Sequence, residues 1–173
     1  MTQDEAQRAQ SGKDSNRLAV AVIMERRRLD NPWVDEAWEA VGVLPSFDEN
    51  DAAPRAIVSE DDRQHWRSGG LAIELFRDEA ENYFLNMSAP IPKVFVMWRK
   101  EDGGARPMAV SVSYGEAARW LDSGEQVDGV PMSREMADWV GDYVNTHYCP
   151  EPRRKVRRND PLADAGKGRR RGP

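Results

Sequence analysis

The sequence predicts an α+β fold, a mainly antiparallel sheet of about six strands with two C-terminal helices packed on it. Three observations lead to this prediction. Short β-rich segments fill much of the chain as far as residue 112. Residues 94–98 and 108–112 flank a polar turn that contains Gly103 and Gly104, which is typical of a β-hairpin. Helical patterns follow these strands, and this segregated order favours α+β over alternating βαβ folds.

The first two strands are the longest β-rich runs. Residues 18–24 are apolar on both faces, so this strand is expected in the centre of the sheet. A turn signal over residues 30–32 separates it from a second strand at residues 33–44. Alternation in the second strand predicts two faces, with Trp38, Ala40 and Gly42 on one and Val41 and Val43 on the other.

Three shorter segments complete the β-rich part. Residues 56–58 form a short expected strand, and residues 71–76 alternate with a period of two after a charged stretch and Gly69-Gly70. Residues 83–87 alternate in the same way. Asp78 to Glu81 could open a helix there instead, so both interpretations stay open for this segment.

Two helices are expected after the hairpin. Ser113 followed by Glu116 fits a capping box, in which the two side chains bond reciprocally at the helix start. Gly124 lies just past the expected end of this helix. Ser133 caps a second helix from about Arg134 to Tyr148, whose apolar stripe consists of Met136, Trp139, Val140, Tyr143, Val144 and His147.

The two ends of the chain differ from its centre. Residues 1–16 and 150–173 lack apolar periodicity and are expected to be disordered, which leaves one α+β domain at residues 17–149. Residues 150–173 carry nine basic and three acidic side chains, a net charge of +6, whereas residues 1–149 carry −11. This basic tail is a solubilising segment or a docking arm. Its expected interaction residues are Glu151, Arg153, Arg154, Lys155, Arg157 and Arg158.

Composition narrows the classes of protein. Cys149 is the only cysteine among 173 residues, so an intramolecular disulfide framework is impossible. The N-terminus lacks the basic and apolar regions of a signal peptide, and no apolar run approaches the roughly 20 residues of a membrane span. A cytoplasmic protein with no membrane partner is therefore expected.

Few residues carry recognisable chemistry. His147 and Cys149 could ligate a metal or act as base and nucleophile, but a structural zinc site needs four ligands. Residues 60–62 with His65 form an acidic cluster that could hold a metal or do acid–base work, but a solvated loop is by far the commoner explanation of such a cluster. The glycine pairs lack phosphate-loop spacing. The sequence therefore predicts no catalytic residue, no metal site and no cofactor, and an enzyme with an unfamiliar site remains an alternative.

Nucleic acid is a further possible partner. Six tryptophans could provide stacking platforms for single strands, although core packing explains most of them. The charge of −11 on residues 1–149 opposes a phosphate backbone, so only the basic tail could supply the attraction. Nucleic-acid binding through the tail is kept as the second hypothesis.

Several short motifs, in one order over residues 18–160, resemble the bacterial family called domain of unknown function 3305. Two differences from the family pattern are Phe76, where a histidine is expected, and Arg153, where an aromatic residue usually follows Glu-Pro. The motifs that carry the resemblance are residues 20–28 with 30–33, 38–45, 74–77, 83–88, 92–96, 113–117, 121–125 and 130–132, and His147 with Glu151-Pro152.

The resemblance implies an association rather than an activity. Proteins of this family tend to be encoded near molybdenum- or tungsten-dependent formate dehydrogenase genes and their maturation factors. Some carry the label of molybdopterin-guanine dinucleotide biosynthesis, but here the first strand is followed by residues 25–28 without the glycine-rich loop of a nucleotidyltransferase. The expected function is a non-catalytic accessory factor whose protein partner is a molybdoenzyme component or maturation factor.

Overall fold

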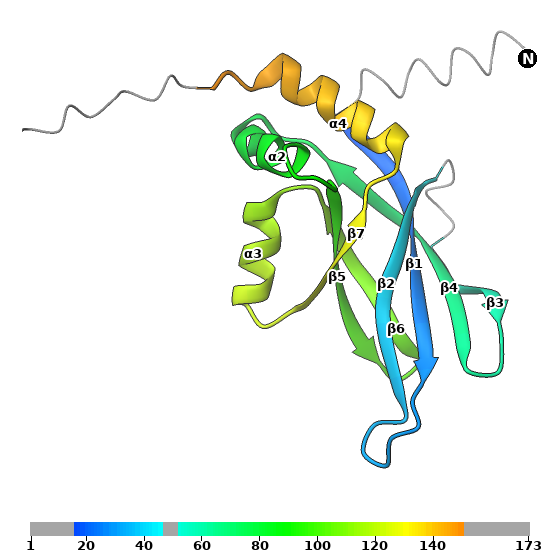
Figure 1. Cartoon of the computed structure of the whole chain (residues 1–173). Coiled ribbons are helices and arrows are strands. Elements are labelled where there is room, and N and C mark those ends of the chain that lie inside the picture. The colour runs from blue at the N-terminus through cyan, green and yellow to red at the C-terminus, as the bar shows by residue number, and fades with distance from the viewer. Residues whose placement is uncertain (1–15, 47–51, 151–173) are drawn as a thin grey trace, which may run out of the picture.

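The computed structural model describes residues 16–46 and 52–150 of the chain. Within them the chain forms seven strands in two antiparallel sheets, three α-helices and one short 3-10 helix (Figure 1). The predicted α+β class is confirmed. The segments expected to be disordered fall outside the described residues, except for Asn16 and Pro150. Asn16, which was expected to belong to the disordered N-terminal segment, exchanges backbone and side-chain hydrogen bonds with Leu75.

The seven strands form one sheet of four strands and one of three. The first has the order β2-β1-β4-β3, with β1 at Arg17–Arg28, β2 at Glu36–Pro45, β3 at Arg55–Ser59 and β4 at Arg63–Glu74. The second has the order β6-β5-β7, with β5 at Lys93–Glu101, β6 at Gly104–Ser111 and β7 at Gln126–Pro131. The sheets approach each other where β4 meets β6 and where β2 meets β7, so they form a flattened, incompletely bonded barrel.

The centre of this barrel is the hydrophobic core. Strand β1 lies between β2 and β4, and Val20 to Met24 are all buried, which confirms the prediction of a central strand. The predicted hairpin is also confirmed, because β5 and β6 pair around the turn at residues 101–104. Valines from both sheets fill the space between them, among them Val22, Val94 and Val96, which have no exposed surface.

The helices gather at one end of the sheets and along the side of the second sheet (Figure 1). A short 3-10 helix, η1 at Arg77–Glu79, leads into α2 at Ala80–Met87, and α4 at Arg134–His147 packs against α2. Helix α3, at Tyr114–Asp122, connects β6 to β7.

Helix α4 agrees with the predicted second helix. Met136, Val140 and Val144 are buried in the common core, whereas Trp139 and Tyr143 are half-buried at its edge. His147, the last residue of the expected stripe, is exposed. The core-facing part of the stripe is therefore narrower than the sequence pattern indicated.

The segment left open between strand and helix is helical. Ala80, Tyr83 and Asn86 are the buried residues of α2, a spacing of three that matches a helix and not a strand. Asn86 stabilises this position because its side chain bonds to the backbones of Lys93 and Val112. The signal that favoured the helix was the acidic opening at residues 78–81.

The expected faces of the second strand were wrong because of a β-bulge. The β1–β2 register shifts between Ile23 and Met24, whose partners are Gly42 and Ala40, so Val41 is the extra residue. The alternation therefore changes phase there. Val43 joins Ala40 in the buried set, while Val41 is exposed.

Strand boundaries also differ from those expected. Strand β2 starts at Glu36 and not at residue 33, and β4 starts at Arg63 instead of residue 71. Strand β7 was not predicted, because Asp128 and Gly129 interrupt its apolar pattern. Strand β2 begins only where its pairing with β1 begins, whereas in β4 and β7 pairing with a neighbouring strand overrides a weak local preference.

Candidate functional site

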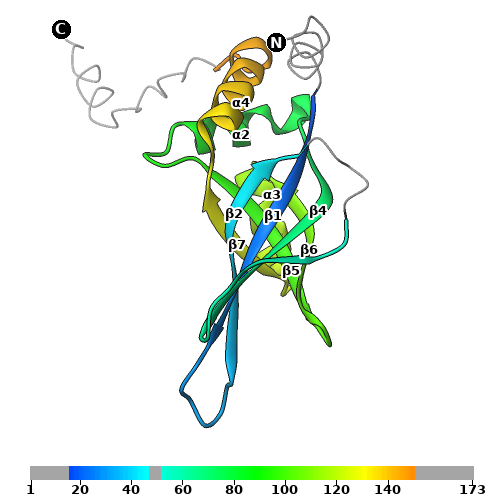
Figure 2. The same cartoon turned by 90° about the vertical axis from the view of Figure 1, so that its right-hand side faces the viewer.

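The hairpin formed by β1 and β2 extends past the other strands at the end opposite α4 (Figures 1 and 2). Its loop, residues 29–35, is closed by a hydrogen bond from the backbone N–H of Leu29 to the carbonyl of Asp35 at 2.9 Å. Inside the loop, the side-chain oxygen of Asn31 accepts the backbone N–H of Trp33 at 2.9 Å. Pro32 restricts the backbone between them.

Trp33 lies in this loop with 90% of its surface exposed. Val34 beside it is also exposed, so the loop presents two apolar side chains to solvent. A tryptophan buries a large area at low cost in side-chain entropy, and it is among the residues most enriched at the energetic centres of protein interfaces. The loop therefore has the chemistry of a docking element.

The stem of the hairpin is held by Glu36. Its carboxylate accepts the indole N–H of Trp38 at 2.9 Å and pairs with Arg26 at 2.6 Å and with Lys100 of β5 at 3.4 Å. Hydrogen bonds from Trp38, Arg26 and Lys100 keep the pKa of Glu36 below its usual range, and the bond from Trp38 has the largest effect. The stem is thus tied to the second sheet, which fixes the direction of the projecting loop.

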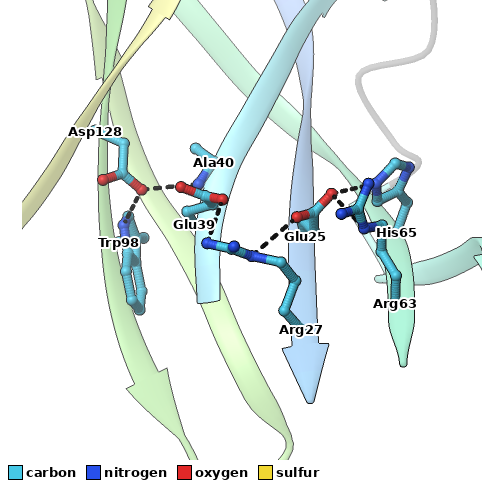
Figure 3. A network of polar contacts seen from close by, with 8 residues as sticks. All are labelled: Glu25, Arg27, Glu39, Ala40, Arg63, His65, Trp98 and Asp128. Atoms are coloured by element: carbon cyan, nitrogen blue, oxygen red, sulfur yellow. Dashed lines mark hydrogen bonds and ion pairs between the residues drawn. The ribbon is translucent and has the colours of Figure 1, made fainter. Parts of the chain in front are cut away.

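A second cluster lies on the outer face of the first sheet. Glu25 of β1 is 8% exposed, and its carboxylate lies 2.8 Å from Nε2 of His65 on β4 (Figure 3). Arg27 approaches the same carboxylate at 3.2 Å and Arg63 at 3.6 Å, and Arg27 also bonds to Glu39 on β2 at 3.0 Å. The cluster therefore joins three of the four strands of this sheet: β1, β2 and β4.

A third polar contact links the two sheets. Asp128 on β7 accepts the backbone N–H of Ala40 and the indole N–H of Trp98 with the same oxygen, each at 2.7 Å (Figure 3). Strands β2 and β7 are not paired as a ladder, so this carboxylate replaces backbone bonding along their seam.

A fourth cluster surrounds the start of α3. The Ser113 hydroxyl accepts the backbone N–H of Glu116, as the predicted cap requires, and also bonds to Glu79. The reciprocal half of the expected box is indirect: the side chain of Glu116 bonds to the Ser111 hydroxyl, which accepts the backbone N–H of Ser113 at 3.1 Å. Arg119 completes the contacts of Glu79 at 2.9 Å.

These clusters have one property in common. The carboxylates of Glu25, Glu36, Glu79 and Asp128 all bond to groups on neighbouring strands or helices. Within residues 16–46 and 52–150, no group of three or more His, Cys, Asp or Glu side chains is arranged to hold a metal ion. Among the large apolar side chains of the described residues, Trp33 has the highest exposed fraction, 90%.

One family model matches most of the chain. The family model described as "Protein of unknown function (DUF3305)" matches residues 19–157. The chain belongs to the DUF3305 family. A search of curated proteins and a search of solved structures each gave no match. The DUF3305 match includes the projecting hairpin with Trp33, all seven strands from residue 19 onward and α4.

The interaction residues expected in the basic tail of this DUF3305 chain stay a prediction. The family match reaches residue 157 and so covers all of them except Arg158. They lie outside the described residues: Glu151, Arg153, Arg154, Lys155, Arg157 and Arg158.

The other candidate residues are separated by the fold. His65 points to Glu25 and not to the acidic residues 60–62, which form the exposed turn between β3 and β4. His147 packs its ring against Tyr143, with the ring centroids 4.3 Å apart, and Cys149 is exposed. Among the helices described, none has both the length and the apolar composition needed to cross a bilayer.

Sequence reasoning considered Trp33 only as one of six tryptophans that could stack on single-stranded nucleic acid, and not as a docking residue. Residues 30–32 were interpreted as a turn, but Trp33 was placed at the start of the following strand. The signal that could have identified it is a tryptophan directly after Asn-Pro, because such a turn ends no sooner than the residue after the proline. Its exposure could be seen only once β2 was found to start at Glu36.

Proposed function

We propose that this protein is a non-catalytic accessory factor that recognises another protein, and that the Trp33 loop is part of its contact surface. The observation that carries the proposal is a tryptophan 90% exposed in a loop whose own hydrogen bonds hold it in place. A loop whose backbone is already held in place loses little entropy when it presents an aromatic side chain to a partner, and this favours affinity.

The use of the polar clusters supports a non-catalytic role. The carboxylates of Glu25, Glu36, Glu79 and Asp128 are each engaged by at least two donors from the fold, as Asp128 is by Ala40 and Trp98. A general acid or base must instead be within reach of a substrate. These carboxylates instead hold neighbouring strands and helices together.

The resemblance to the family supplies the specific form of the proposal. Its association with formate dehydrogenase genes suggests that the partner is a component or maturation factor of a molybdenum-dependent formate dehydrogenase. The protein would then assist assembly or maturation of that enzyme in the cytoplasm, with the basic tail as a second contact.

The test is affinity capture of the tagged full-length chain from the organism that encodes it. We expect capture of a formate dehydrogenase component or maturation factor, and we expect Trp33→Ala to lower its affinity about 30-fold, as loss of an interface centre does. Leu121→Ala is the matched control, because Leu121 is 57% exposed on α3 and is not part of the loop.

Two results would count against the proposal. If the intact chain recovers neither kind of protein, the formate dehydrogenase form is wrong. If a partner is recovered equally well by Trp33→Ala and by Leu121→Ala, the Trp33 loop is not the contact surface. Thermal unfolding of both variants should match that of the intact chain, because exposed substitutions change stability by about 0.5 kcal/mol or less.

A further inference from the structure

Strand β3, at Arg55–Ser59, is the outer strand of the first sheet (Figure 1). It pairs with β4 along one edge, and within the described residues no strand pairs with its other edge. All five of its residues are exposed, among them two β-branched apolar ones, Ile57 and Val58. An edge of this kind presents backbone N–H and C=O groups to any further strand that approaches it.

The other outer strands have neighbours across the barrel. Strand β2 approaches β7, where Asp128 bridges the two, and β6 approaches β4. Among the outer strands of the described part of the chain, β3 alone has substantial contact with only one strand. Its outer edge is therefore the one that the fold leaves for another chain.

Two features that normally protect an edge strand are missing from the centre of β3. Proteins block such edges with charged side chains, proline, a bulge or a covering segment. Residues 56–59 include no charge and no proline, and a bulge at Ile57 is present, where the register with β4 shifts. The centre of β3 is therefore chemically suited to pairing with another strand.

The charges at the two ends of β3 are opposite. Arg55 is its first residue, and the acidic residues 60–62 form the exposed turn directly after it. Arg63, which follows the turn, approaches Glu25 at 3.6 Å. Two copies of β3 in antiparallel orientation place Arg55 of each copy beside the acidic turn of the other, whereas parallel copies would bring like charges together. The edge is thus self-complementary, as the surface of a two-fold dimer must be.

We propose that two copies of this chain pair through β3 in antiparallel orientation and form a dimer with one continuous sheet. The four strands of each first sheet then make a sheet of eight, which is within the usual size of open sheets. The acidic turn lies beside the stem of the Trp33 hairpin, because the backbone N–H of Arg28 bonds to the carbonyl of Asp62 at 2.8 Å. The two-fold axis therefore places the two Trp33 loops at opposite ends of the dimer.

Sedimentation equilibrium of the full-length chain at about 0.15 M salt tests the dimer. We expect a mass that rises from one chain toward two between about 10 µM and 1 mM protein, since a contact between two strand edges is smaller than a standard interface. Ile57→Lys brings two like charges together at the centre of the contact and should raise the dissociation constant about tenfold or more. Leu121→Lys adds the same charge at an exposed position on α3 and should dimerise like the intact chain.

A set of charge variants tests the contacts at the two ends. Arg55→Glu makes both ends of the edge acidic, and the double variant Glu60→Lys, Asp61→Lys makes both ends basic. Each should dimerise about tenfold more weakly than the intact chain, because like charges then meet. An equimolar mixture of the two should regain the affinity of the intact chain, because every end faces an opposite charge.

Three results would overturn the proposal. The first is a single chain at every concentration up to about 1 mM. The second is an equal dissociation constant for Ile57→Lys and Leu121→Lys, as expected if the basic tail of one copy binds the acidic domain of another. The third is a mixture of charge variants that associates no better than either variant alone. Thermal unfolding shows which variants are folded, and Val58→Lys replaces Ile57→Lys if that variant is not.

Discussion

The carboxylate of Asp128 accepts the backbone N–H of Ala40 at 2.7 Å, across 88 positions of sequence and across the seam between the two sheets. The bond lies next to the bulge at Val41, where the β1–β2 register shifts. The same oxygen accepts the indole N–H of Trp98, so one side chain connects β2, β5 and β7. It closes the barrel at a point where no backbone ladder does.

Asp128→Ala should therefore lower the free energy of unfolding by about 2–4 kcal/mol, because it leaves two donors without their acceptor. Urea denaturation measures this change. Asp138→Ala, an exposed position on α4, is the control and should stay within about 0.5 kcal/mol of the intact chain. A loss as small as that in Asp128→Ala would mean that the seam closes without this contact.

Met136 and Trp139 separate the buried and partly buried parts of the α4 stripe. Met136 is fully buried, so Met136→Ala should cost about 2–5 kcal/mol. Trp139 is half-buried, and Trp139→Ala should cost less than the 3–5 kcal/mol typical of a fully buried tryptophan, about 1–3 kcal/mol. Chemical denaturation of both variants checks the order, and a larger loss for Trp139 would contradict the position of α4.

Tyr83 links stability to high pH. Burial raises the pKa of its hydroxyl to about 12, and the hydroxyl accepts the backbone N–H of Phe76 at 3.1 Å. Because the folded pKa is higher than the unfolded one, near 10, this contribution is complete below about pH 10 and is lost as the pH rises toward 12. The experiment compares the intact chain with Tyr83→Phe at about pH 9 and about pH 11, and the intact chain should lose about 1–2 kcal/mol more. Parallel losses would show that Tyr83 does not titrate in this way.

Glu79 links stability to low pH. Hydrogen bonds from Ser113, Arg119 and Asn82 keep the pKa of this carboxyl below its ordinary value of 4.5, and the bond from Ser113 has the largest effect. Its contribution is therefore present above about pH 4.5 and is lost as the pH falls through the lowered pKa. Glu79→Gln should cost about 1–2 kcal/mol at neutral pH and progressively less in acid. Glu81→Gln, exposed in the first turn of α2, should show no such trend in the same titration.

The basic tail provides a prediction about binding. Removing residues 150–173 takes away a net charge of +6 and should weaken capture of the protein partner, more strongly at low salt, while the thermal transition changes little. Removing only residues 160–173 should have a small effect. Equal capture by the longer truncation at all salt concentrations would place recognition on the folded domain alone. Salt-sensitive binding of DNA that disappears with the tail would instead favour the nucleic-acid hypothesis.

Local patterns accounted for the elements that depend mainly on their own residues. The β5–β6 hairpin was predicted because its turn residues and flanking strands are adjacent in sequence. The starts of α3 and α4 were predicted from Ser113 and Ser133, whose hydroxyls cap those helices. The candidate site was not predicted to the same degree, because exposure of Trp33 depends on where β2 begins to pair.

The sequence by itself determined the α+β class, the central position of the strand at residues 18–24 and the separation of acidic and basic charge, since each follows from composition or short-range periodicity. Only the tertiary structure decided that Val43 is buried while Val41 is exposed, and that Asp128 joins the sheets. These features depend on strand register and on contacts between distant residues. A hydrophobic pattern repeats along one strand, but it holds no information about which partner strand shifts its phase.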